Sequence, residues 1–161
     1  MMNNLLSYKA WIIIVSLLFT LNAYSNGLSP KDSLQSLEVA DGMKAELFAS
    51  EPMLLSPSSI DIDHKGRVWV AEIVNYRGHN GKRAEGDRII ILEDTDGDGV
   101  ADQSKTYYQG RDIDSPHGVC VLGNKVIVSA GEQVLIFTDN NDDDKPDDKK
   151  VLFNVIGGKQ H

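Results

Sequence analysis

Two stretches decide the fold: residues 59–72 read SIDIDHKGRVWVAE, and residues 117–130 read HGVCVLGNKVIVSA. Aligned at an offset of 58 residues, each contains an alternating apolar run, a turn, a basic residue and a second run rich in β-branched side chains. Alternation with a period of two around a turn is typical of a β-hairpin. The chain therefore contains the same predicted hairpin twice, which indicates a repeat architecture.

The repeat continues downstream of each hairpin. Residues 89–92 (IIIL) match residues 134–137 (VLIF), and residues 106–108 (TYY) match residues 151–153 (VLF), both at an offset of 45. The offsets differ because the first copy carries an insertion of 13 residues within residues 73–87. Without it, each copy has about 45 residues and four short antiparallel strands, which is the size of a propeller blade.

We therefore predict an all-β fold, a partial β-propeller with about two four-stranded antiparallel blades. Blade one is expected over residues 59–108 and blade two over residues 117–153. Residues 43–49 are expected to form the strand that closes the last blade of a ring, and the next blade would begin at residue 161. A two-sheet sandwich is the alternative, although it does not explain the offsets. Because propellers need about four blades or more, we expect the chain to be the N-terminal part of a larger ring.

The N-terminal segment resembles an export signal. Lys9 ends a short positive region, residues 10–21 form an apolar run, and residues 23–25 (AYS) are small enough for an export protease. We predict a signal helix over residues 1–25 that is removed, a leader over residues 26–42, no membrane span afterwards, and a periplasmic or extracellular location. An uncleaved, membrane-associated segment is the alternative. The intact mass of the exported protein tests this prediction, and a mature chain that retains its first residue would contradict it.

The composition excludes several classes of partner. The 161 residues carry a net charge of −8, with 24 acidic and 16 basic side chains. Binding of nucleic acid requires a basic surface, so we expect no nucleic-acid partner. The single cysteine, Cys120, cannot form an internal disulfide bond and is expected to be buried because it lies in an apolar run. The sequence has no CxxCH motif, so we expect no haem in this chain.

Two acidic turns have the spacing of calcium-binding loops. Residues 94–102 (DTDGDGVAD) place carboxylates at positions 1, 3, 5 and 9, with Gly99 at position 6, as in an EF-hand-like loop. Residues 139–147 (DNNDDDKPD) repeat this spacing but place Asp144 where a left-handed turn favours glycine. A solvated acidic turn is the alternative for both. The predicted calcium ligands are Asp94, Asp96, Asp98 and Asp102, with a weaker set of Asp139, Asn141, Asp143 and Asp147.

The order of the strands sorts the loops onto two rims. Successive connections of an up-and-down meander leave opposite ends of the sheet, so the insertion and the links between blades share one rim and the acidic turns lie on the other. His117 leads into an innermost strand on the first rim, where a neutral histidine can take a proton from a substrate hydroxyl. A hydrogen-bonded turn residue is the alternative. The residues expected on this rim are Tyr76, Arg77, His79, Arg83, Arg111, Asp112, Asp114 and His117, with Glu72 and His161 nearby.

Four runs together resemble a known family. They are residues 46–52 (ELFASEP), 59–72, 88–102 (RIIILEDTDGDGVAD) and 115–119 (SPHGV). They are similar to the N-terminal propeller of the membrane-bound dehydrogenase family, which is related to glucose/sorbosone dehydrogenases and whose longer members add a haem-binding CxxCH domain. The resemblance covers residues 39–161 and implies a six-bladed propeller that oxidises a sugar or polyol alcohol with pyrroloquinoline quinone (PQQ).

The resemblance also implies a site. Its catalytic histidine stands before the first strand of a blade, a place that His161 occupies here, and His117 is the second candidate because of its position on the rim. Arg111 and Asp114 are the candidate cofactor-binding residues on the same rim. We expect this fragment alone to be inactive. A calcium-stabilised propeller that binds a ligand or protein without chemistry is the alternative, because a fold alone allows both.

Overall fold

The computed structural model describes residues 27–79 and 81–154. The predicted signal segment and His161 therefore lie outside the described residues. The chain divides into two compact units, Met1–Ala45 and Glu46–His161. The described part of the first unit contains helix α2 (Pro30–Gln35), which begins after Ser29, whose side chain accepts a hydrogen bond from the Asp32 N–H. No helix among the described residues has the length and apolar character needed to cross a membrane.

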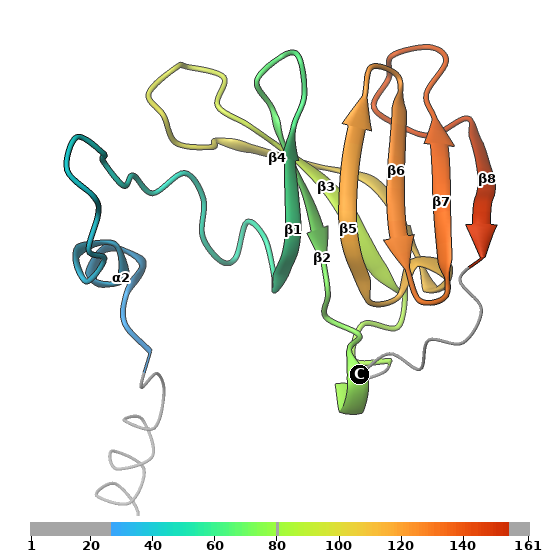
Figure 1. Cartoon of the computed structure of the whole chain (residues 1–161), viewed down its shortest axis with the longest axis horizontal. Helices are drawn as coiled ribbons and strands as arrows, with labels where there is room; N and C mark the ends of the chain where they lie inside the picture. The colour runs from blue at the N-terminus through green and yellow to red at the C-terminus, as the bar shows by residue number, and fades with distance from the viewer. Residues whose placement is uncertain (1–26, 80, 155–161) are drawn as a thin grey trace, which may run out of the picture. The chain divides into compact units, whose positions relative to one another are not determined.

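The second unit consists of two four-stranded antiparallel sheets, which confirms the all-β, blade-like prediction (Figure 1). In each sheet the strands pair in the order of the chain, as in an up-and-down meander. Blade one comprises β1 (Pro57–Ile62), β2 (Val68–Glu72), β3 (Asp87–Glu93) and β4 (Gln103–Gly110). Blade two comprises β5 (Pro116–Leu122), β6 (Lys125–Ala130), β7 (Gln133–Thr138) and β8 (Asp148–Asn154).

The predicted strand over residues 43–49 is not formed. In the structure these residues carry no strand, and their link to blade one includes a hydrogen bond from the Ala101 N–H to the Phe48 carbonyl. A strand requires a ladder of such bonds with a neighbour, and none of the described strands pairs with this segment.

The core is built on both faces of blade one. Ile89 and Ile91 of β3 face blade two and pack with Trp69, Tyr107 and side chains of blade two such as Phe137. Ile90 and Leu92 point to the opposite face, as the period of two requires. There they are covered by the segment that precedes β1, through Phe48, Ala49, Met53 and Leu54. Of the segment expected to be a strand, Phe48 and Ala49 therefore cover this face of blade one.

The second face of blade two lacks such a cover among the described residues. Leu122 of β5 is 59% exposed, and Phe153 of β8 is 53% exposed. Cys120, expected to be buried, is exposed for the same reason, because its strand presents it on this face. Exposed apolar surface of this kind marks an interaction surface in a soluble protein.

The innermost strands of the two blades lie side by side, and polar groups join them (Figure 1). The Ser58 hydroxyl donates to the Pro116 carbonyl at 2.6 Å, and the Val121 N–H donates to the Asp61 carboxylate at 2.7 Å. These bonds satisfy backbone groups of β5 that have no strand partner on that side. They fix the register between the blades and hence the position of the loops at each end.

Candidate functional site

The insertion after β2 and the link between the blades meet on one rim, as the order of strands predicted. The His117 ring packs edge-on against Tyr76, with 5.7 Å between the ring centroids and an interplanar angle of 84°. The Arg77 guanidinium lies 4.8 Å from the centre of the same tyrosine ring. His117 itself is exposed at the beginning of β5. The rim therefore presents an aromatic side chain, a guanidinium group and an imidazole next to one another.

A buried carboxylate anchors this arrangement. Asp87 is fully buried and accepts hydrogen bonds from the N–H groups of Val74 (2.9 Å), Asn75 (3.0 Å) and Ser115 (2.9 Å). The Ser115 hydroxyl in turn donates to the Asn75 carbonyl at 2.5 Å. One aspartate thus holds both the insertion and the residues just before His117. The sequence analysis did not identify Asp87. An acidic residue at the start of an apolar strand gives no indication that its carboxylate will bind the backbone of two distant loops.

Asn75 and Asp114 extend this network. The buried Asn75 side chain donates to the Arg83 carbonyl at 2.8 Å and to the Asp114 carboxylate at 2.9 Å. The same Asp114 oxygen accepts the Asp87 N–H at 3.0 Å, and the other oxygen pairs with Arg111 at 2.9 Å. The two candidate cofactor-binding residues, Arg111 and Asp114, are therefore in contact. Both oxygens of the Asp114 carboxylate already have partners within the rim. Arg111, whose side chain is 53% exposed, is the one that faces solvent.

Glu72 forms a second buried centre under the rim. Its carboxylate, which is fully buried, accepts hydrogen bonds from Arg88 (2.7 and 2.9 Å), from Arg83 (2.7 Å) and from the Leu55 N–H (2.8 Å). Burial alone would raise the pKa of Glu72, but these hydrogen bonds, led by the one from Arg88, outweigh it and hold the pKa below its ordinary value of 4.5. The group is therefore a permanent anion at neutral pH.

Left-handed backbone conformations occur on this rim at residues other than glycine. Ser56, Arg77 and Ser115 have φ angles of 44°, 50° and 59°. Such residues are strained, and they persist where surrounding contacts determine the backbone. Ser115 shows this, because its N–H and hydroxyl are both held by the buried network.

One residue expected on the rim lies elsewhere. Asp112 accepts hydrogen bonds from the Tyr108 hydroxyl (3.0 Å) and from Lys149 of β8 (2.7 Å), so it joins the outer strands of the two blades. The reason is the short 3-10 turn Arg111–Ile113, which turns adjacent side chains in different directions. His79 ends another short turn, Arg77–His79, in the insertion.

The first acidic turn gathers three of its four predicted ligands at the opposite end of blade one. Carboxylate oxygens of Asp94, Asp96 and Asp102 lie within 4.8 Å of one another. Asp98 is not in this group, and its carboxylate accepts the Val100 N–H at 2.8 Å. The Asp94 carboxylate accepts the Gly99 N–H, which is the main reason that its pKa is lowered. The loop therefore gathers three of the four predicted ligands around the left-handed Gly99.

The second acidic turn gathers a different set from the predicted one. Asp139, Asp142 and Asp144 place carboxylate oxygens within 4.8 Å of one another, whereas the carboxylates of Asp143 and Asp147 are not in the group. Asp142 and Asp144 adopt φ angles of 58° and 62°, where the first turn has Gly97 and Gly99 with 79° and 89°. Both turns thus have the same shape. The second turn tolerates the strain while its two aspartates pair with cationic side chains of blade one.

Solved structures of carbohydrate-active enzymes have a similar fold. The holo form of the PQQ domain of pyranose dehydrogenase from Coprinopsis cinerea matches with a TM-score of 0.58 and 21% identity, over 77% of this chain and 27% of that one. A calcium structure and an iodide structure of a family AA12 carbohydrate-active enzyme from Trichoderma reesei each match with a TM-score of 0.55 and 20% identity, over 76% of this chain and 28% of those.

At these identities the likeness shows a shared fold, that of a β-propeller. The chain spans roughly a quarter of the length of the solved chains it matches. No curated protein sequence matches it. A family model described as a domain of unknown function, DUF7133, matches residues 29–161, and the chain belongs to that family.

Proposed function

We propose that the chain forms the first two blades of an exported propeller that oxidises a sugar or polyol alcohol with PQQ. The observation that carries the proposal is the rim in which Asp87 and Asn75 hold His117 and Tyr76 in place. A binding surface without chemistry does not require a base fixed in this way. The similar fold of the pyranose dehydrogenase PQQ domain supports the same proposal.

The chemistry of the rim fits such a cofactor. PQQ is a planar quinone with carboxylate groups, and planar guanidinium groups bind carboxylates with two parallel hydrogen bonds. Arg111 and Arg77 supply guanidinium groups on this rim, and the ring of Tyr76 supplies an aromatic surface. These residues would hold the cofactor, which when bound supplies the acceptor for the two electrons removed from the alcohol.

His117 has the properties of a base in that reaction. The imidazole ring of His117 is exposed, and its edge-on contact with the Tyr76 ring limits the rotation of the imidazole. It would hold the proton released by the substrate hydroxyl as the alcohol carbon is oxidised. His161 is the first candidate for this role through the family resemblance, and it lies outside the described residues.

Two observations support a longer protein with further blades. The second face of blade two exposes Leu122 and Phe153, and the chain covers about a quarter of the structures it resembles. A cofactor site at the centre of a ring takes residues from several blades, so the present chain is proposed to be inactive alone and prone to associate through that face.

The test is quinone-dependent dye reduction by a longer protein that contains this chain, with a panel of sugars and polyols. We expect oxidation of at least one substrate when PQQ is added, and none in a matched sample without PQQ. A folded protein that reduces no dye with any substrate, while PQQ and calcium are present, would contradict the proposal and favour the binding propeller.

The alternative, a calcium-stabilised propeller without chemistry, is favoured by the first acidic turn. The three carboxylates of Asp94, Asp96 and Asp102 and the turn around Gly99 would hold a hard cation through oxygen ligands. Weak affinity, on the order of 10⁻⁴ to 10⁻³ M, is typical of extracellular modules.

The Asp96→Ala variant is expected to lose calcium uptake at this turn in isothermal titration calorimetry, because it removes one of the three gathered carboxylates. Asp98→Ala is the matched control, since its carboxylate is turned towards the Val100 N–H and lies outside the group. Equal calcium uptake in the wild type and Asp96→Ala would show that this turn is not the site.

A further inference from the structure

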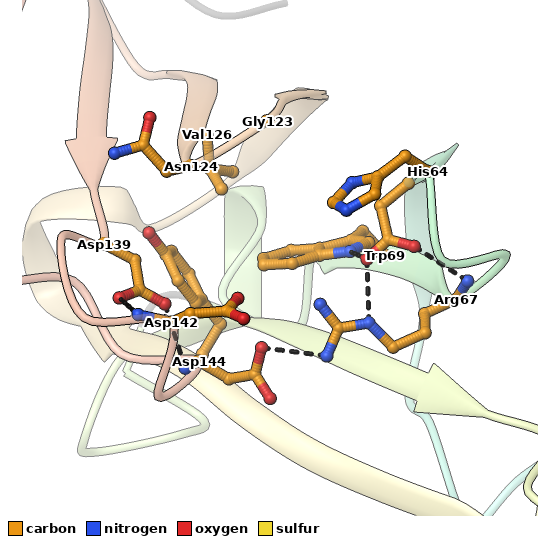
Figure 2. Close-up of a pocket in the computed structure, with 11 residues that line it drawn as sticks. His64, Arg67, Trp69, Gly123, Asn124, Val126, Asp139, Asp142 and Asp144 are labelled. Carbon is orange, nitrogen blue, oxygen red and sulfur yellow. Dashed lines mark hydrogen bonds and ion pairs between the residues drawn. The ribbon is translucent and has the colours of Figure 1, made fainter.

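A second feature lies between the blades at the end opposite the proposed quinone site, and it is independent of the quinone chemistry. A cavity of about 30 Å³ is bounded by the first turn of each blade and by the second acidic turn (Figure 2). Its lining includes Trp69 and Tyr107 of blade one and Asp139, Asp142 and Asp144 of blade two. The side chains that line it thus come from parts of the chain distant in sequence.

Tyr107 has an unpaired polar atom at this cavity. The residue is 3% exposed, and its hydroxyl has no hydrogen-bond partner among the described residues. A buried hydroxyl without a partner is costly, and in proteins such groups are normally satisfied by a water molecule or an ion. The phenol oxygen of Tyr107 can accept a hydrogen bond through its lone pairs.

The charges around the cavity do not balance. Blade one brings three cations to this end: Arg67 pairs with Asp63 and Asp144, Lys105 with Asp144, and Lys65 with Asp142. Asp139, which is only 7% exposed, accepts hydrogen bonds from backbone N–H groups alone, and no Lys or Arg of the described residues pairs with it. Four carboxylates therefore face three cations, and the excess negative charge is at the buried Asp139.

The geometry suits a small oxygen-coordinated ion. The carboxylate oxygens of Asp139, Asp142 and Asp144 lie within 4.8 Å of one another, and hard cations take such oxygens as ligands. A cavity of about 30 Å³ exceeds the roughly 10–15 Å³ that one water-sized species needs. Figure 2 shows the three aspartates on one side of the cavity and Trp69 with Arg67 across it.

We propose that this cavity binds one hard cation of the calcium class between the blades, through the carboxylates of Asp139, Asp142 and Asp144. The Tyr107 hydroxyl accepts a hydrogen bond from a water molecule on the ion, which gives its oxygen a partner. The bound ion neutralises the negative charge of Asp139 and replaces Lys65 as the partner of Asp142. The side chains of Lys65 and Asp142 are 40% and 76% exposed, so their ion pair is easily displaced. This ligand set differs from the EF-hand-like positions 139, 141, 143 and 147.

Terbium is a suitable probe because it replaces calcium and its emission is sensitised by nearby aromatic rings. Trp69 and Tyr107 line the cavity, so sensitised emission from the full chain reports occupation of this site. We expect Asp142→Asn to weaken terbium binding at least tenfold, with calcium competing in the wild type. Asp143→Asn is the matched control, because it removes the same charge from the neighbouring residue, outside the group. Its affinity is expected to stay within twofold of the wild type.

The reverse pattern would overturn the proposal. Loss of affinity in Asp143→Asn with none in Asp142→Asn would place the ion in the EF-hand-like positions instead. Loss of the sensitised emission in Asp96→Asn would assign it to the first acidic turn. Asp142 is exposed, so thermal unfolding without metal is expected to match the wild type and to exclude misfolding as the cause.

Tyr107→Phe tests the hydroxyl separately, because it removes only the oxygen. Binding of terbium is expected to weaken severalfold while the ring contacts with Trp69 and Phe137 remain. Unchanged affinity in Tyr107→Phe would contradict the role of the hydroxyl. None of these measurements uses turnover, so their failure is distinguishable from failure of the proposed oxidation.

Discussion

The Glu72→Ala variant is expected to lower the free energy of unfolding by about 3–5 kcal/mol, the range for removing one partner of a buried ion pair. The variant leaves the guanidinium groups of Arg83 and Arg88, whose side chains are 12% and 25% exposed, without their shared carboxylate. Urea denaturation measures the change. Glu85→Ala is the control, since Glu85 is an exposed glutamate in the insertion that follows β2 and should change stability little.

The dependence on pH tests the same ion pair. The pKa of Glu72 is lower in the folded state than its ordinary value of 4.5. The ionised Glu72 therefore stabilises the fold fully above pH 4.5, and this stabilisation is lost as the pH falls below 4.5 and through the folded-state pKa. The difference in stability between the wild type and Glu72→Gln is therefore expected to be largest near neutral pH and to shrink below pH 4.5. A difference that is constant from neutral to acidic pH would contradict a charged Glu72.

Replacing the proposed catalytic base is expected to have the largest effect on activity. In a longer protein that oxidises a substrate with PQQ, His161→Ala or His117→Ala should lower kcat by about a hundredfold or more, the scale for a general base. His117 is exposed on the rim beside Tyr76, and the family resemblance favours His161. Kinetics with saturating substrate and quinone measure the loss.

Binding of PQQ to each variant is the control, because a base acts on the reaction and not on cofactor affinity. A hundredfold loss of kcat with unchanged PQQ binding would identify the base. Equal rates in the wild type and both variants would remove His117 and His161 from the mechanism. Loss of PQQ binding in His117→Ala would instead assign this residue to cofactor contact.

The sequence predicted the blades closely because their signals are local. Alternating side chains and tight turns predicted blades over residues 59–108 and 117–153, and the sheets extend over residues 57–110 and 116–154. The sorting of loops onto two rims also followed from strand order alone, since an antiparallel meander leaves no other arrangement. The contact between Tyr76 and His117, which are far apart in the chain, agrees with it.

By itself, the sequence therefore determined the strands of the two blades, where the insertion lies and which loops share an end of the sheets, because each depends on neighbours in the chain. Only the tertiary structure decided the rest. Phe48 and Ala49 cover a face of blade one without forming a strand, because a strand needs a partner that local pattern does not supply. Lys65 pairs with Asp142 and Arg67 pairs with Asp144, each across 77 residues of chain. These ion pairs determine which carboxylates of the second acidic turn lie close together.

Asp87 holds the rim together through hydrogen bonds from backbone N–H groups. Any acidic side chain can accept such bonds, so only the folded structure shows that Asp87 is the one that does.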